Sequence, residues 1–214
     1  MNLLPRLLLC LLALLPPIAL AQSRPAAVVE GEDYVLIANP QPFAPLAGKI
    51  EVAEVFGYTC PHCAHFEPLL EAWAAKQRKD VRLTLVPGAF GGIWDNFASA
   101  FFAAQQLGVQ SRSHRALFEA IHDTRSVPVQ NVSPEELAAF YKAYGVEPQR
   151  FVQAFNSPQV AAQVKAAREF AMRTEVTGTP SLVVNGKYLV KGKGFEDMLR
   201  IADALVARER AAAR

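Results

Sequence analysis

The sequence predicts an α/β protein in which a lobe of helices interrupts a sheet domain. Alternating, β-branched segments occur towards the two ends of the chain, as expected of strands. Residues 90–173 between them show amphipathic helical patterns and no convincing strand. Two cysteines, Cys60 and Cys63, stand where a predicted strand passes into a predicted helix. Together these observations indicate a sheet domain with a helical insertion.

The first elements form a strand–helix–strand unit. Residues 34–38 are typical of a short strand, and residues 49–58 alternate like a central strand. Pro61 suits the first turn of a helix because its missing N–H costs nothing there. Apolar residues at helical spacing extend this helix to about residue 78. Residues 81–86 form the next strand, so the order is that of a βαβ unit.

Five amphipathic helices are expected in the lobe. Ser133 and Ser157, each followed by proline, are signals for helix starts, and Gly108 and Gly145 are signals for helix ends. The chain then closes with a hairpin and a last helix: residues 181–185 and 187–191 are strands joined at Asn-Gly, and residues 196–210 are helical. The domains expected are a signal peptide over residues 1–21, a sheet domain in two parts over residues 22–89 and 168–214, and an inserted helical domain over residues 90–167.

The first residues have the layout of a secretory signal peptide. Arg6 precedes an apolar run over residues 7–20, and Ala19-Leu20-Ala21 offers a small-residue cleavage site. A membrane anchor is the alternative, but the run is short for a span and contains two prolines. We therefore expect cleavage after Ala21, which also removes Cys10, and export to an oxidising compartment. Without Arg6 the chain has 21 basic residues against 20 acidic ones, a balance that gives no electrostatic footprint for nucleic acid.

The cysteine pair is better explained by redox chemistry than by structure. A disulfide across four residues stabilises a fold by only about 2 kcal/mol, compared with about 4.7 kcal/mol for a 100-residue loop. Covalent haem attachment needs histidine directly after the second cysteine, where this chain has Ala64. Zinc is also disfavoured, because Cys60, Cys63, His62 and His65 share one helical turn and cannot surround a tetrahedral ion. A pair that cycles between dithiol and disulfide remains.

Cys60 is expected at the start of the helix, where free N–H groups and the helix dipole favour negative charge. Both effects lower the pKa of its thiol, and His62 in the first turn can lower it further. Cys63 lies one turn along the same face and can reach back to Cys60. A stabilised Cys60 thiolate leaves readily, so we expect the pair to act as an oxidant.

A Thr179-Pro180 pair stands directly before the predicted hairpin. A cis bond there would leave the Thr179 backbone free to pair with an extended chain, although an ordinary trans loop is the alternative.

These features together resemble the DsbA family of periplasmic thiol:disulfide oxidoreductases: a leader peptide, Cys-Pro-His-Cys at a strand–helix junction, a helical insertion and Thr-Pro before a hairpin. The resemblance covers essentially the whole chain after the leader. It implies a thioredoxin fold with an inserted all-helical domain, and a monomer in the periplasm with no bound cofactor beyond the redox-active Cys60–Cys63 disulfide. Reduced, unfolded exported proteins would be its substrates, and a DsbB-like membrane quinone reductase would reoxidise it.

The resemblance also implies roles for individual residues. Cys60 would attack, Cys63 would resolve, and His62 between them would tune the redox potential, with Pro61 completing the catalytic motif. Pro180 would be a cis-proline facing the pair, with Thr179 lining the substrate site.

Two acidic residues match the family pattern. Glu54 would be a buried acid that shuttles the Cys63 proton, whereas Glu67 is expected on a solvated helix face. Leu85 occupies the place of a lysine that pairs with the buried acid in well-known members, so the pKa of Glu54 should be raised more. His114 and His122 are expected at the surface or its boundary.

Two other functions stay open at this point. A disulfide isomerase or reductase would use the same motif, although no dimerisation domain is visible. A peptide-binding, chaperone-like module with a vestigial cysteine pair is the non-catalytic alternative.

Overall fold

The computed structural model describes residues 27–213 of the 214-residue chain. The expected signal peptide, its cleavage point after Ala21 and Cys10 lie outside these residues. None of the helices in the described part combines the length and apolarity that a membrane crossing needs.

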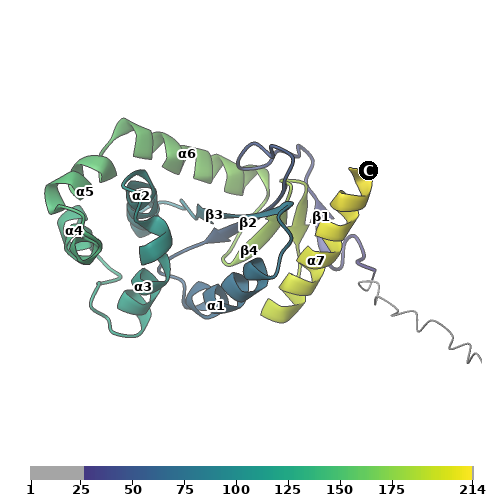
Figure 1. The fold of residues 1–214 in the computed structure, drawn as a ribbon, viewed down its shortest axis with the longest axis horizontal. Helices are drawn as coiled ribbons and strands as arrows, with labels where there is room; N and C mark the ends of the chain where they lie inside the picture. The colour runs from purple at the N-terminus through teal and green to yellow at the C-terminus, as the bar shows by residue number, and fades with distance from the viewer. Residues whose placement is uncertain (1–26, 214) are drawn as a thin grey trace, which may run out of the picture.

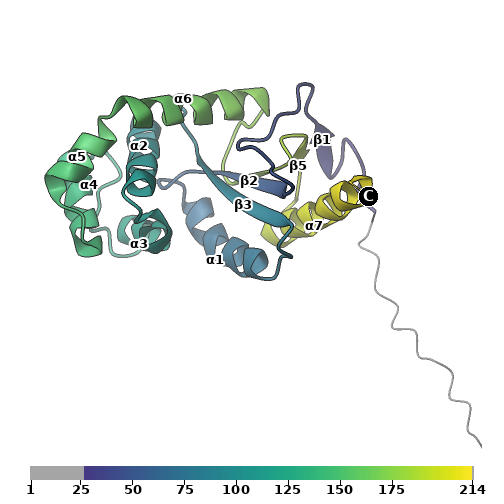
Figure 2. The ribbon, with the colours of Figure 1, turned by 45° about the horizontal axis from the view of Figure 1, so that its top comes forward.

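Five strands form one mixed sheet in the order β1-β5-β4-β2-β3 (Figures 1 and 2). The strands are β1 (Tyr34–Leu36), β2 (Ile50–Phe56), β3 (Val81–Pro87), β4 (Ser181–Val184) and β5 (Tyr188–Val190). Strand β2 runs parallel to β3 and antiparallel to β4, and all its residues are buried. The predicted strands and the central place of residues 49–58 are confirmed.

Helices α1 (Pro61–Ala75) and α7 (Phe195–Ala212) lie side by side on one face of the sheet (Figure 1). Their apolar side chains form a core with this face of β2, in which Phe66 and Leu205 join Val52. Trp73 ties the two helices together, because its indole N–H donates a 2.9 Å hydrogen bond to Asp203. Helix α1 is therefore packed against β2, the strand that leads into it, and is bonded to α7.

The helical lobe lies beyond one end of the sheet, at the left of Figure 1, and its last helix extends back across the opposite face from α1. The lobe contains α2 (Ile93–Gln106), α3 (Gln110–His122), α4 (Pro134–Tyr141) with a 3₁₀ turn over Lys142–Tyr144, α5 (Pro148–Phe155) and α6 (Pro158–Arg173). The predicted helix starts are confirmed: Ser133 forms a reciprocal capping box with Glu136, and Ser157 accepts a hydrogen bond from Val160 N–H.

Lobe and sheet share one hydrophobic core. Val55 and Phe56 of β2 belong to the same buried cluster as Phe101 of α2, Leu117 of α3 and Phe151 of α5. Helix α6 is continuous across residues 167 and 168, so the expected domain boundary lies inside it. The packing therefore fixes α3 against α1, next to the cysteine motif. The fold class is confirmed as α/β, with the helical insertion between β3 and β4.

Candidate active site

Cys60 is the N-cap residue of α1, and Pro61 occupies the first helical position. The backbone of Cys60 is extended, with φ −89° and ψ 114°. The Cys60 carbonyl oxygen accepts hydrogen bonds from the N–H groups of Cys63 and Ala64, at 3.1 and 3.2 Å. The side chain makes no cap bond, so it stays free at the helix start. Cys60 is half-buried and Cys63 is buried, and the two sulfurs are not joined in a disulfide in this structure.

The surroundings of Cys60 favour its thiolate. A hydrogen bond from the Cys63 thiol is the main reason that its pKa falls from 9.0 to about 5. Burial opposes this shift, while the Thr179 side chain and the backbone N–H groups of Cys63 and His62 reinforce it. Cys60 is therefore an anion at neutral pH, as the sequence predicts.

Cys63 has the opposite character. Burial raises the pKa of its thiol above the ordinary value, and its hydrogen bond to Cys60 and the nearby charge of Glu54 add to the rise. The N–H of Gly57 lies 3.5 Å from its sulfur. The two thiols thus differ sharply in acidity, so one is ready to attack while the other holds its proton.

The Thr179–Pro180 bond is cis, and the loop that contains it faces the cysteines. The Cys60 sulfur lies 3.4 Å from the carbonyl oxygen of Thr179, which directly precedes the cis-proline and β4. The site residues expected from two distant parts of the chain therefore meet at one place.

His62 is exposed beside Cys60. Among the hydrogen bonds that lower the Cys60 pKa, its contribution comes from the backbone N–H. Within residues 27–213, no three His, Cys, Asp or Glu side chains gather as a metal site.

Glu54 is buried in the centre of the sheet with 1% of its surface exposed. Its strand neighbours are Leu85 on β3 and Leu182 on β4, and neither carboxyl oxygen has a hydrogen-bond partner. Burial raises its pKa well above the ordinary value, and the charges of Glu67 and Cys60 raise it further. The expected burial, the neighbouring Leu85 and the direction of the pKa shift are confirmed.

The surface positions expected for Glu67 and His114 are wrong. Their exposures are 9% and 4%, because α3 packs on α1 and covers both side chains. His114 Nε2 lies 3.3 Å from Glu67 Oε2, but the two atoms are not aligned as a hydrogen bond. The spacing of His114 with Leu117, Phe118 and Ile121, all buried on one side of α3, was the signal that could have placed it inside.

Tyr58, two residues before Cys60, is held by both histidines of α3. Its hydroxyl lies 2.7 Å from His114 Nδ1, and its carbonyl oxygen lies 2.7 Å from His122 Nε2. His122 is partly exposed, which agrees with the boundary position expected for it. The short segment between β2 and the cysteine motif is thereby fixed to the lobe.

Comparison with known proteins agrees with this geometry. Residues 51–206 match the family model described as a DSBA-like thioredoxin domain. The thiol:disulfide interchange protein DsbA of Pseudomonas aeruginosa is 40% identical over 187 residues, covering 86% of this chain and 87% of that protein. That of Azotobacter vinelandii is 39% identical over 192 residues, covering 88% and 87%.

Solved structures of the same family are also similar to this chain. The crystal structure of the oxidoreductase DsbA from Xylella fastidiosa has a TM-score of 0.85 and 62% identity, covering 86% of this chain and 98% of that one. The crystal structure of P. aeruginosa DsbA has a TM-score of 0.79 and 40% identity, covering 87% and 96%. The chain therefore belongs to the DsbA-like thioredoxin family, and its dithiol is that of a thiol:disulfide oxidoreductase.

Proposed function

We propose that the protein is a dithiol oxidase that donates its Cys60–Cys63 disulfide to reduced, unfolded exported proteins. The observation that carries this proposal is the acidity of Cys60, whose pKa is about 5. A sulfur that is stable as an anion is a good leaving group, so the disulfide that contains it is reactive and oxidising. The reduced form is stabilised and the oxidised form passes its bond to a substrate.

The reaction takes two exchanges. A substrate thiolate attacks the Cys60 sulfur, which forms a mixed disulfide and releases Cys63 as a thiolate. Cys63 takes a proton, and Glu54, whose pKa burial raises, is the acid placed to supply it. A second substrate thiolate then attacks the substrate sulfur of the mixed disulfide, so a substrate disulfide forms and the Cys60 thiolate leaves. Two electrons have passed from the substrate to the cysteine pair.

Thr179 and Pro180 are the proposed substrate-binding residues. The Thr179 carbonyl oxygen lies beside the Cys60 sulfur, at the start of β4. An extended substrate segment that reaches Cys60 passes this oxygen, and its backbone N–H can donate to it. Pro61 and His62 lie between the two cysteines and are exposed beside Cys60, which supports them as the residues that tune the redox potential.

We place the protein in the periplasm as a monomer, with the leader over residues 1–21 supporting export. The reduced pair would be reoxidised by a DsbB-like membrane quinone reductase. The cycle needs no bound cofactor, because the cysteine pair itself carries the electrons.

Mixing the oxidised protein with a reduced, unfolded disulfide protein tests the proposal. We expect one substrate disulfide to form per molecule of protein, with loss of the Cys60–Cys63 bond, measured by mass after thiol alkylation. Equilibration with glutathione measures the redox potential of the cysteine pair, and a strongly reducing potential would favour a reductase. If no disulfide is transferred to the substrate, the oxidase proposal is wrong.

A further inference from the structure

Gly57, the residue after β2, is bonded to both cysteines. Its N–H donates to the Cys63 sulfur at 3.5 Å, and its carbonyl oxygen accepts the N–H of Cys60 at 3.0 Å. Burial raises the pKa of Cys63, and the hydrogen bond from Gly57 acts against that rise. The bond therefore favours the charged form of the sulfur. Since Cys63 is otherwise protonated at neutral pH, this bond matters while the sulfur leaves or attacks as a thiolate.

Trp94, in the first turn of α2, lies directly on Gly57. A methyl group on Gly57 would meet the Trp94 ring, with Cε3 at 2.8 Å, Cη2 at 2.9 Å and Cζ3 closer still. The backbone of Gly57 is outside the left-handed region, so it is the ring that excludes a side chain here. Because glycine has the freest backbone of all residues, an outside contact is needed to hold its N–H in one direction. Trp94 supplies that contact.

A second aromatic residue holds the Trp94 ring in place. A methyl group on Gly88 would meet the Phe90 ring at 2.7 Å, and the rings of Phe90 and Trp94 are in edge-to-face contact with centroids 5.2 Å apart. Gly57 and Gly88 directly follow the ends of the parallel strands β2 and β3. The two rings therefore rest on two neighbouring strand ends. The packing between Gly57 and Trp94 leaves no volume for a water molecule.

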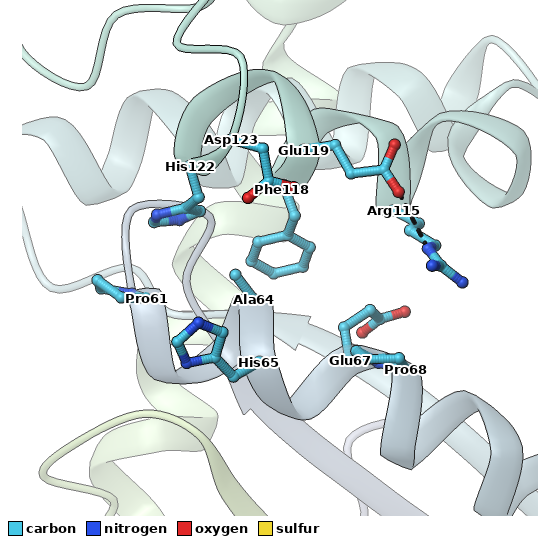
Figure 3. A pocket seen from close by; sticks show the side chains of 10 residues that line it. All are labelled: Pro61, Ala64, His65, Glu67, Pro68, Arg115, Phe118, Glu119, His122 and Asp123. Atoms are coloured by element: carbon cyan, nitrogen blue, oxygen red, sulfur yellow. Dashed lines mark hydrogen bonds and ion pairs between the residues drawn. The ribbon is translucent and has the colours of Figure 1, made fainter.

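The lobe also faces α1 across a different surface, the groove between α1 and α3 (Figure 3). Phe118 of α3 points towards Ala64 of α1 there, and neither Gly57 nor Trp94 lines this groove. The contact between Trp94 and Gly57 is therefore a separate link between the lobe and the cysteine motif. It can be changed without altering the groove.

We propose that Trp94 is a positioning residue for Cys63: by lying on Gly57, it holds the Gly57 N–H against the Cys63 sulfur while that sulfur carries negative charge. This inference rests on the proposed function and names a residue of the helical lobe that acts on the disulfide exchange. Trp94 itself touches neither the substrate nor the reacting sulfurs in this role.

The proposed contact affects one step of the cycle in both directions. When a substrate thiolate attacks Cys60, a bond forms between those two sulfurs, the Cys60–Cys63 bond breaks, and its electron pair leaves on Cys63. Closure is the reverse: the Cys63 thiolate attacks the mixed disulfide and the substrate thiolate leaves. Both directions share one transition state with charge on Cys63, so a positioned donor speeds both. The equilibrium should hardly change, because Cys63 is a neutral thiol or a disulfide sulfur at the two ends.

The experiment measures this step in both directions with glutathione. Oxidised protein and reduced glutathione give the rate at which Cys63 leaves. Reduced protein and glutathione disulfide first form a mixed disulfide at Cys60 and then close, and samples quenched in acid are resolved by mass. Trp94→Leu should slow the release of Cys63 and the closure by the same factor, about fivefold or more, since a hydrogen bond to a charged group is lost. Mixed-disulfide formation and the equilibrium with glutathione should stay within about twofold.

A size swap tests whether the contact itself is responsible. Gly57→Ala should slow the step as Trp94→Leu does, because the added methyl group displaces the ring and turns the N–H. In the double variant the methyl group occupies space that the smaller leucine leaves, so both rates should return to within about threefold of those of the unaltered protein. Trp94→Phe, a milder change that serves if Trp94→Leu does not fold, should give an intermediate slowing.

Two control variants change the lobe without changing this contact. Phe102→Leu removes a buried ring of α2 that does not line the space around Gly57. Glu119→Gln alters the groove between α1 and α3, where Glu119 pairs with Arg115 at 3.1 Å. Both variants should keep all three rates within about twofold of the unaltered protein.

Unchanged rates of Cys63 release and closure in Trp94→Leu or Trp94→Phe would overturn this inference. So would a double variant that is no faster than the single ones. Equal slowing of mixed-disulfide formation at Cys60, or a shifted equilibrium with glutathione, would mean that Trp94 only supports the fold. In all these cases the unaltered protein still transfers its disulfide, whereas its failure to do so would overturn the proposed function.

Discussion

The Cys60 sulfur lies 3.4 Å from the backbone oxygen of Thr179, a residue 119 positions later in the chain. This contact brings the start of α1 against the cis Thr179–Pro180 loop at the entry to β4. The reactive sulfur and the backbone that can receive an extended substrate are therefore neighbours. The same threonine also acts on the charge of the sulfur, because its side chain helps to lower the Cys60 pKa.

Thr179→Val should raise the Cys60 pKa. Valine has the shape of threonine without the hydroxyl, so the hydrogen bond to the thiolate is lost. Such a bond to a charged group contributes roughly 1.5 kcal/mol, which corresponds to a rise of about one pKa unit. The midpoint of ultraviolet thiolate absorbance in the reduced protein measures it. Thr177→Val, at an exposed position nearby, is the control, and equal midpoints for the two variants would contradict the assigned role.

Cys63→Ala should accumulate mixed disulfides. The substrate bonded to Cys60 can then be released only by a second substrate thiol, because no neighbouring thiol competes for the bond. Reacting this variant with the disulfide-linked dimer of a single-cysteine peptide lets the Cys60 thiolate attack that disulfide and release one peptide thiol, so mass measurement without reductant should show one peptide per chain. Cys60→Ala with Cys63 intact should hold almost none, since burial raises the pKa of Cys63 and keeps it protonated. Equal trapping by both variants would mean that the roles are misassigned.

The reduced protein should gain stability over the oxidised protein as pH rises. The Cys60 pKa falls from 9.0 in the unfolded chain to about 5 in the fold, so between these values the unfolded chain binds one more proton. Stability therefore increases with pH across that window and is lost as pH falls through about 5. The disulfide form has no thiol to titrate and lacks this contribution.

Urea unfolding of both redox forms between pH 4 and 8 measures the difference. Groups common to the two forms largely cancel, and reduced Cys60→Ala provides a reference in which the rise should disappear. A gap between the redox forms that does not change with pH would show that the fold does not stabilise the Cys60 thiolate.

Local sequence patterns predicted the elements around the site. The alternation in residues 49–58 marked β2, and Pro61 marked the first turn of α1. Together they placed Cys60 at a helix start, where the chemistry of its thiolate follows from general physical rules. These features depend on neighbours in the chain, which is why the sequence alone sufficed.

The remaining parts of the site depend on packing between distant segments. Glu67 has polar helix neighbours such as Glu71, and only the arrival of α3 buries it against His114. The geometry of the Thr179–Pro180 bond is likewise set by the sheet and α1 around it, so the residue pair alone left both isomers open. His114 is the instructive case: its residue type led to the wrong expectation of a surface position, whereas its helical spacing with Leu117, Phe118 and Ile121 would have indicated burial.

Glu54→Gln should stabilise the oxidised protein at neutral pH. The carboxyl group of Glu54 is buried without a hydrogen-bond partner, and its pKa is raised well above 4.5. A raised pKa gives stability that is present below the unfolded value and lost as pH rises, because the unfolded chain releases its proton first. Glutamine stays neutral and avoids this loss. At pH 7 the variant should be more stable by at least about 1 kcal/mol, since each pKa unit corresponds to about 1.4 kcal/mol.

At pH 4 glutamic acid and glutamine are both neutral, so the difference should nearly vanish. Urea unfolding of the oxidised forms at several pH values measures it, with Glu30→Gln at an exposed site as the control that shows no such trend. The same Glu54→Gln variant should be slower in closing the disulfide, so stability and activity should move in opposite directions. If Glu54→Gln is no more stable than the unaltered protein at pH 7 and closes its disulfide at the normal rate, two claims about Glu54 are wrong: that its ionisation destabilises the fold, and that it exchanges a proton with Cys63.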